Sequence, residues 1–191
     1  LYGNSHNMLD SEIVQANTTL PEYFTKHGYI TMSKGKIFHK HTTVNGLDHG
    51  HWAFDIWEKV DGRQKIDPAL YFCRDEGIIR GEKIENPKYV KGGGSRLAFG
   101  PLLNATEETK DYNTAKWFEA KLQEDYDKPF FMAVGISKPH LPFHAPKEFF
   151  DMHPIEDVVV PEFRMDDLND ILNERGDAAF KPHVDFLWCQ E

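Results

Sequence analysis

The sequence predicts an α/β fold with a mostly parallel sheet, and three observations predict it. Residues 20–34 show a helix pattern that leads into a strand pattern through a single glycine. Residues 109–126 have the periodicity of a second helix, and the apolar run 130–136 follows it. Such a run is typical of a strand buried on both faces, as in a parallel sheet. Only two or three strands are apparent, so we expect a piece of a larger α/β domain.

The first helix is expected at 20–27, because its start and stop signals are both present. Thr19 is a suitable N-cap, and Glu22 three residues later completes a capping box. Pro21 is tolerated in the first turn, and Gly28 suits the left-handed residue that ends a helix. Residues 29–34 follow directly and predict a strand, because they are rich in β-forming types.

The long stretch 40–108 is expected to be an irregular excursion, because it is rich in Gly, Asp, Pro and Asn. The helix at 109–126 is predicted from apolar residues at near-helical spacing. These residues are Tyr112, Ala115, Phe118 and Leu122, with Trp117 beside them. After the apolar strand, 147–151 predicts a helical turn, and the loop-rich remainder holds one candidate strand at 158–160.

The composition indicates a globular chain with an acidic surface. Its 191 residues are 40% hydrophobic, and 22 Lys and Arg against 31 Asp and Glu give a formal net charge of −9. Such a surface repels phosphate backbones and argues against nucleic-acid binding. No apolar run approaches the ~20 residues of a membrane span. An anionic substrate would therefore need a local cationic pocket.

Basic side chains follow both predicted strands at the point where each strand ends. Lys36 and His39 follow the first strand, and Lys138 and His140 follow the second. Because ligands bind beyond the carboxyl ends of the strands in open α/β sheets, parallel strands would bring these side chains to one cavity. Lysine attracts anions, and histidine transfers protons near neutral pH. The pattern predicts an anion site with proton transfer; the alternative is solvated lysines and packed histidines.

A second group of histidines has a spacing that suits zinc. It consists of two His-x-His pairs, His39 with His41 and His49 with His51. Imidazole nitrogens are good zinc ligands, but no cysteine stands near these pairs. Loop histidines beside a polar cleft are therefore the favoured interpretation.

Two further candidates also have a structural interpretation that is favoured. Cys73 stands beside an arginine, as a nucleophile can, yet a buried structural thiol is favoured for both Cys73 and Cys189. One disulfide between them is arithmetically allowed. The acidic pair 166–167 and Asp170 lack the Gly and Glu of a helix-loop-helix calcium loop, and we interpret them as solvated surface.

Two segments of the chain resemble type I sulfatases. The first is 19–39, which contains Gly35-Lys36-Ile37-Phe38-His39, and the second is 128–149, which contains Lys138-Pro139-His140. The Lys-x-x-His spacing of the first resembles the iduronate-2-sulfatase-like subgroup. The resemblance implies an alkaline-phosphatase-like α/β sandwich and the hydrolysis of sulfate esters, carried by a small molecule or a glycan.

The same resemblance implies roles for four residues. Lys36 would bind the sulfate, and His39 would support the nucleophile or the breakdown of its sulfate adduct. His140 would contact the sulfate and assist the leaving oxygen, and Lys138 would line the pocket as a substrate-binding residue. An extracytoplasmic location is implied by the family alone, and no oligomeric state is predicted.

The family also implies a calcium ion and a formylglycine nucleophile, made from Cys or Ser in a Cys-x-Pro-x-Arg motif. That motif does not occur in this sequence. We therefore expect residues 1–191 to be an interior segment of one sulfatase catalytic domain, with the nucleophile and metal ligands outside it and no activity alone. The alternatives are a phosphate mono- or diester hydrolase of the same superfamily and a non-catalytic protein that binds sulfated glycans.

Overall fold

The computed structural model describes residues 12–38, 52–73, 77–83, 97–162, 164 and 166–178. The chain separates into two compact units. Unit 1 comprises Leu1–Arg63 and Thr106–Lys138, and unit 2 comprises Gln64–Ala105 and Pro139–Glu191. Each unit has a β-sheet of its own.

Unit 1 is built on a three-stranded sheet in which the strands run parallel. β1 (Ile30–Gly35) lies in the middle, between β2 (Ile56–Glu58) and β7 (Phe130–Gly135). β1 and β7 pair along their whole length, so that their first and last residues stand opposite each other. The predicted α/β class and its parallel pair of strands are confirmed.

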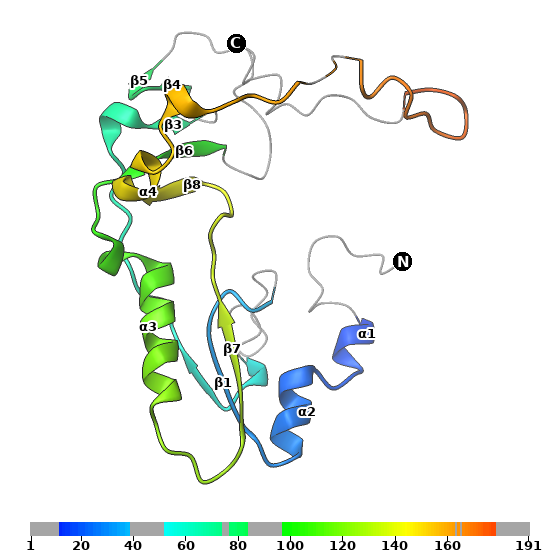
Figure 1. Ribbon diagram of the computed structural model, residues 1–191. Coiled ribbons are helices and arrows are strands. Elements are labelled where there is room, and N and C mark those ends of the chain that lie inside the picture. Colours follow the sequence, from blue (N-terminus) through cyan, green and yellow to red (C-terminus); the bar gives the residue numbers. More distant parts are fainter. Residues whose placement is uncertain are drawn as a thin grey trace. The chain divides into compact units, whose positions relative to one another are not determined.

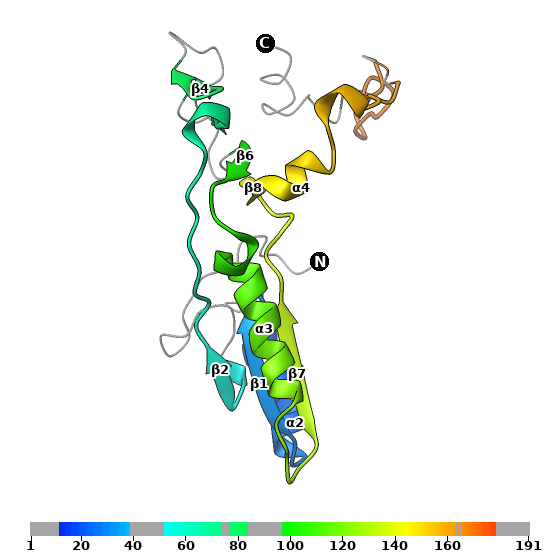
Figure 2. The same cartoon turned by 60° about the vertical axis from the view of Figure 1, so that its left-hand side comes forward.

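Helices lie on both faces of this sheet (Figures 1 and 2). α2 (Leu20–Lys26) packs against β1, and α3 (Lys110–Leu122) packs against β1 and β7. The Phe24 ring of α2 stacks on the Phe131 ring of β7, with the ring centroids 4.5 Å apart. A short helix, α1 (Glu12–Gln15), precedes α2, and the 3-10 turn η5 (Thr106–Glu108) leads into α3. Two layers of helix therefore enclose the paired strands.

α2 forms as its capping signals predict. The backbone N–H of Thr19 donates to Glu22 Oε2 at 2.9 Å, and the Thr19 hydroxyl donates to the same oxygen at 2.7 Å. Pro21 stands in the first turn and is buried. Gly28 adopts a φ of +84°, in the left-handed region that ends the helix and turns the chain into β1.

α3 is shorter than predicted, and it buries a different face. The residues that it buries are Thr114 and Trp117. Two of the four residues of the predicted apolar stripe, Ala115 and Leu122, are exposed, so that part of the prediction is wrong. Thr114 tolerates burial because its hydroxyl donates to the carbonyl of Lys110 at 3.0 Å, one turn earlier.

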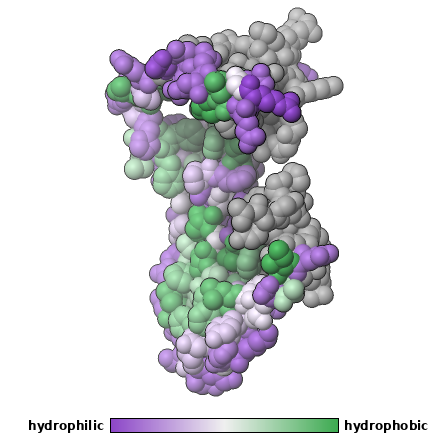
Figure 3. All heavy atoms as spheres, turned by 90° about the vertical axis from the view of Figure 1, so that its right-hand side faces the viewer, coloured by the Kyte–Doolittle hydropathy of each residue, from purple (hydrophilic) through white to green (hydrophobic). Residues whose placement is uncertain are grey.

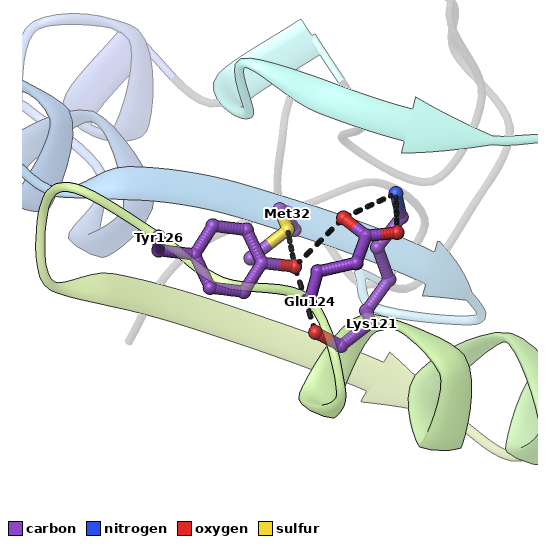
Figure 4. Close-up of polar contacts among 4 residues, drawn as sticks. All are labelled: Met32, Lys121, Glu124 and Tyr126. Carbon is purple, nitrogen blue, oxygen red and sulfur yellow. Dashed lines mark hydrogen bonds and ion pairs between the residues drawn. The ribbon is translucent and has the colours of Figure 1, made fainter.

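Tyr126 fixes the chain after α3 to the middle strand of the sheet (Figure 4). Its hydroxyl donates to the carbonyl of Lys121 at 2.7 Å and lies 3.6 Å from the sulfur of Met32, which is fully buried in β1. Glu124 lies 3.2 Å from the same hydroxyl and forms an ion pair with Lys121. Burial, followed by the nearby Glu124 carboxylate, raises the pKa of Tyr126. Because the Tyr126 hydroxyl donates to a carbonyl in the last turn of α3, Tyr126 lies outside the helix, which ends earlier than its sequence pattern predicts.

Unit 2 holds a five-stranded sheet. Its order is β5 (Glu82–Lys83), β4 (Ile78–Ile79), β3 (Phe72–Cys73), β6 (Ala98–Leu102) and β8 (Phe143–Pro146). Only β6 and β8 run parallel; the other neighbours are antiparallel. Because β2 to β6 fall within 40–108, the prediction of an irregular excursion is wrong for the described part of that stretch. These strands of two to five residues are too short to show a clear alternation of apolar and polar residues.

The chain beyond β8 follows the prediction in one place and departs from it in another. α4 (Lys147–Asp151) confirms the helical turn and packs on β8 and β6. The 3-10 turns η3 (Pro68–Leu70) and η6 (Ile155–Asp157) complete the helical elements of unit 2 among the described residues. Residues 158–160 are not a strand, because they are exposed and pair with no described strand. That residues 1–191 form part of one catalytic domain stays a prediction.

Apolar side chains remain exposed on both units, as the green spheres on the face in Figure 3 indicate. In unit 1 they include Phe130, the first residue of β7, and Ile136, the residue after it. In unit 2 they include Ile155 and Val159. β7 is an edge strand of its sheet among the described residues, and strands this apolar are usually covered on both faces. None of the described helices is long and apolar enough to cross a membrane.

Two glycines allow the ends of β1 and β7 to approach each other closely. Gly35 adopts a φ of +90°, and a Cβ built on it would collide with the carbonyl oxygen of Gly135. A Cβ on Gly135 would collide with the backbone of Lys36. Backbone atoms cannot move aside as a flexible side chain can, so both positions require glycine.

Asp55 ties the segment before β2 to β1. Its Oδ2 accepts from the backbone N–H and the hydroxyl of Thr31, both at 3.0 Å, and its own N–H donates to the Thr31 hydroxyl at 3.0 Å. Thr31 is fully buried. Because a buried polar group that loses its partner is costly, this contact stabilises the sheet.

We expect Asp55→Ala to lower the free energy of unfolding by about 1–3 kcal/mol, since it leaves the buried N–H of Thr31 without its acceptor and the Thr31 hydroxyl with the Thr25 hydroxyl alone. Urea denaturation measures the change. Asp61→Ala removes the same charge from an exposed position and serves as the control, with an expected change within about 0.5 kcal/mol. Equal effects of the two substitutions would contradict the assigned role.

We expect Gly135→Ala to separate the ends of β1 and β7, because the new methyl group meets the backbone of Lys36. The free energy of unfolding should fall by at least about 2 kcal/mol, which is the usual cost of overpacking. Hydrogen exchange should show faster exchange at the Lys36 amide. Gly28→Ala is the comparison: it strains a left-handed backbone, but its Cβ meets nothing within 4 Å, so the Lys36 amide should stay better protected than in Gly135→Ala. Equal protection of that amide in the two variants would refute the expectation.

Candidate functional site

The two predicted basic loops begin at the same edge of the sheet in unit 1. The Lys36 N–H donates to the carbonyl of Gly135 at 3.0 Å, which carries the pairing of β1 and β7 one residue beyond β1. Lys138 follows Gly135 after two intervening residues. Both lysines are half-buried. The prediction that Lys36 and Lys138 follow neighbouring parallel strands is therefore confirmed for the backbone.

Lys36, just beyond β1, differs from Lys34, the lysine within β1. Lys34 is buried, and its Nζ lies 2.5 Å from Oε1 of Glu58, which stands opposite it in β2. Among the described residues, no ion pair joins Lys36 to a carboxylate. The charge of Lys34 thus belongs to the sheet, while Lys36 stands just beyond its edge.

The loop after β7 is held by a carboxylate from α3. The backbone N–H groups of Ser137 and Lys138 donate to Oδ1 and Oδ2 of Asp111, each at 2.9 Å. Asp111 stands in the first turn of α3 and is half-buried. Sequence reasoning missed Asp111, because its partners lie 26 and 27 residues away. An acidic residue in a first helical turn ordinarily indicates only a favourable interaction with the helix dipole.

The groups around Lys138 have opposing effects on the pKa of its ammonium group. Burial is the main cause that lowers the pKa of the Lys138 ammonium. The carboxylate of Asp111 acts in the opposite direction, and the nearby Lys110 acts in the same direction as burial. Among the described residues, the Asp111 carboxylate is thus a charge that favours the ammonium form of Lys138.

His140 lies in unit 2, whereas Lys36 and Lys138 lie in unit 1, so their meeting in one cleft stays a prediction. The His140 ring is exposed, and its Nδ1–H donates to the carbonyl of Leu141 at 2.6 Å. In the neutral ring this tautomer leaves Nε2 as the basic nitrogen. The next peptide bond, Leu141–Pro142, is cis. The sequence segment of His140 also contains His144, which is buried in β8 with its ring 6.0 Å from that of Tyr71.

Several candidates fall outside the described residues. These are His39, the zinc candidates His41, His49 and His51, and Cys189. Cys73, by contrast, is fully buried in β3 and carries a free thiol. Such burial suits a structural thiol and does not suit a nucleophile that must reach substrate.

The acidic candidates of unit 2 lie in an exposed turn. Asp166 forms an ion pair with Arg164 at 2.9 Å, and the hydrogen bond from Arg164 lowers the pKa of Asp166. Asp167 and Asp170 are exposed in the same turn. Among the described residues, no group of three or more His, Cys, Asp or Glu is placed to hold a metal ion.

Comparison with known proteins gives a consistent result for the family. No family model matches the chain. It is 29% identical over 162 residues to a protein named Sulfatase from Formosa agariphila, an alignment that covers 85% of this chain and 30% of that protein. It is 31% identical over 153 residues to Iduronate 2-sulfatase of Homo sapiens and equally to that of Mus musculus, covering 75% of this chain and 24% of each relative.

The chain spans less than a third of the length of these relatives. The similarity nevertheless extends over most of the chain itself, and it agrees with the mixed α/β architecture and its parallel strands. Over three quarters or more of its length this chain is a relative of the sulfatases, and its sequence belongs to the sulfatase family.

Proposed function

We propose that the protein carrying this chain hydrolyses sulfate esters and that this chain supplies part of the sulfate pocket. The observation that carries the proposal is the similarity to sulfatases over 75% to 85% of the chain. The placement of Lys36 and Lys138 after two paired parallel strands supports it, because ligands of open α/β sheets bind at that edge.

Lys36 and Lys138 are proposed to bind the sulfate oxygens. A lysine and an anion ~4 Å apart attract each other by about 1 kcal/mol in bulk water and by about 4 kcal/mol near a protein surface. Because both lysines are half-buried, the larger value applies more closely to them. Burial has its own cost for Lys138, whose pKa it lowers, and the anion would offset that cost.

His140 is proposed to protonate the leaving oxygen. In the overall reaction water supplies one oxygen to sulfur, the bond between sulfur and the ester oxygen breaks, and the alcohol leaves with one proton. An alkoxide is a poor leaving group without that proton, and imidazole is the side chain that most often transfers protons in enzymes. Support of the nucleophile is proposed for His39.

Calcium and formylglycine are proposed for the whole protein on the family resemblance alone. In the family, formylglycine supplies the attacking oxygen and calcium stabilises the negative charge of the sulfate. The described residues contain no cluster suited to a metal, so neither group is assigned to them and no step is derived through it.

The substrate is proposed to be a sulfated sugar, because two of the relatives are named Iduronate 2-sulfatase. An extracytoplasmic location is proposed on the family resemblance, and fractionation of expressing cells tests it. A protein found wholly in the cytoplasmic fraction would refute that location.

The reaction class is tested with the full-length protein on p-nitrophenyl sulfate, p-nitrophenyl phosphate and a sulfated disaccharide. We expect release of sulfate from the disaccharide or the aryl sulfate at a rate well above that of phosphate release. Faster release of phosphate would instead indicate a phosphate esterase of the same superfamily. Binding of the sulfated sugar without turnover would indicate a non-catalytic glycan-binding protein.

We expect His140→Ala to lower kcat by roughly 10²-fold, the usual contribution of a positioned proton donor. Lys36→Ala should lower kcat/KM, because it removes a charge that contacts the sulfate. His153→Ala and Lys128→Ala change exposed residues of the same types and are the matched controls. Steady-state kinetics of all four variants measure these effects. An unchanged rate in His140→Ala would remove its assigned role.

A further inference from the structure

We propose that Asp111 is the positioning residue of the sulfate pocket, because its carboxylate holds the loop that carries Lys138. This inference rests on the proposed function, which gives the loop its role. It assigns to α3 a task beyond covering the sheet, and it makes a residue that touches no substrate necessary for sulfate binding.

The geometry of the contact suits a carboxylate that holds a loop in place. The pairing of β7 with β1 ends at Gly135, so the backbone amides that follow need another acceptor. The N–H groups of Ser137 and Lys138 find it in the two oxygens of Asp111, each at 2.9 Å. Hydrogen bonds to an ionised acceptor are roughly twice as strong as neutral ones, and two bonds to one carboxylate fix direction as well as distance.

The lengths and directions of α3 and β7 place Asp111 beside the loop that follows β7. α3 has 13 residues and β7 has six, so each is about 20 Å long. The connection between them is short, and Figure 1 shows that they run in opposite directions. The first turn of α3 therefore comes level with the carboxyl end of β7. Thr109 caps that turn, with its hydroxyl accepting from the N–H of Tyr112 at 3.4 Å.

The hydrogen-bond partners of Asp111 differ from those of a residue that only stabilises its own helix. A carboxylate in a first turn favours its own helix through the helix dipole and the exposed amides of that turn. Both oxygens of Asp111 instead accept from a segment 26 and 27 residues further along the chain. The contact thus fixes one element on another, as a residue that positions a functional loop must do.

Asp111 also influences the charge of Lys138. The charged groups that act on it among the described residues are Asp111 and Lys110, both from α3. Burial lowers the pKa of Lys138 and Asp111 raises it. Loss of the Asp111 charge would lower that pKa further, so that Lys138 would lose its proton at a lower pH and bind an anion less well on the alkaline side.

The test is Asp111→Asn in the full-length protein, with two readouts that need no catalysis. The first is the rate of acetylation of Lys138 by acetic anhydride as a function of pH, followed by mass spectrometry. The second is hydrogen exchange at the amides of Ser137 and Lys138. We expect the midpoint of acetylation to move to lower pH and both amides to exchange faster.

Glu119→Gln is the matched control, because it removes a carboxylate charge from the same helix at an exposed position. Glu119 pairs with Lys116 of its own helix at 2.6 Å. It should leave the acetylation midpoint and the exchange rates of the loop unchanged. An Asp111→Asn protein that behaves like this control in both readouts would overturn the proposal.

Asp111→Glu separates the charge from the geometry and carries the test if Asp111→Asn fails to fold. It keeps the charge but displaces the carboxylate by one methylene. We expect faster amide exchange, with an acetylation midpoint closer to wild type than that of Asp111→Asn. Unchanged exchange in Asp111→Glu would contradict the geometric part of the proposal.

Turnover of the sulfate ester gives a third readout. Asp111→Asn should lower kcat/KM by about tenfold or more, as misplacement of a binding group does, and should move the alkaline limb of the pH profile to lower pH. If the wild-type protein shows no sulfate turnover, the proposed function fails. Acetylation and exchange then still decide the role of Asp111.

Discussion

The close approach of Gly35 and Gly135 is the constraint on which the arrangement of unit 1 depends. A side chain at either position would push apart the backbones of β1 and β7 at their carboxyl ends. With glycine at both, the two strands pair to their last residues, and the Lys36 amide adds one more bond to the ladder. The loops that leave the sheet therefore start side by side. A functional site built from these loops therefore depends on glycine at both positions.

How much of this fold the sequence predicts depends on the range of the signal. α2, β1 and β7 were predictable, because a capping box, a terminal glycine and an apolar run are local features. β3 was not, because its two residues are defined by partners such as Ala98, which stands opposite Cys73. Thr114 shows a second failure. A polar residue suggests an exposed position, yet its hydroxyl is satisfied within the helix and the residue is buried.

The residues of the candidate site differ in the same way: some are predictable from local sequence pattern and one is not. Lys36 and Lys138 were predictable as residues that follow strands, since that rule needs only the strand ends. Asp111 was not, because its contact with the loop depends on the matched lengths and opposite directions of α3 and β7. A single sequence carries no mark of that match. Candidate ligand-binding residues can thus be proposed from local pattern, while residues that would hold them in place require the tertiary structure.

The negative net charge of the chain is compatible with an anion site, because local pairing decides the potential felt by the anion. Exposed charges are screened beyond ~8–10 Å at physiological ionic strength. Among the described residues, the carboxylates that contact β1 or the loop after β7 are engaged: Asp55 accepts from Thr31, Glu58 pairs with Lys34, and Asp111 accepts two backbone N–H groups. Each is therefore partly neutralised by its own donors. Lys36 lies two residues beyond Lys34 and just past the end of β1, and no ion pair joins it to a described carboxylate, which is compatible with its proposed role toward an anion.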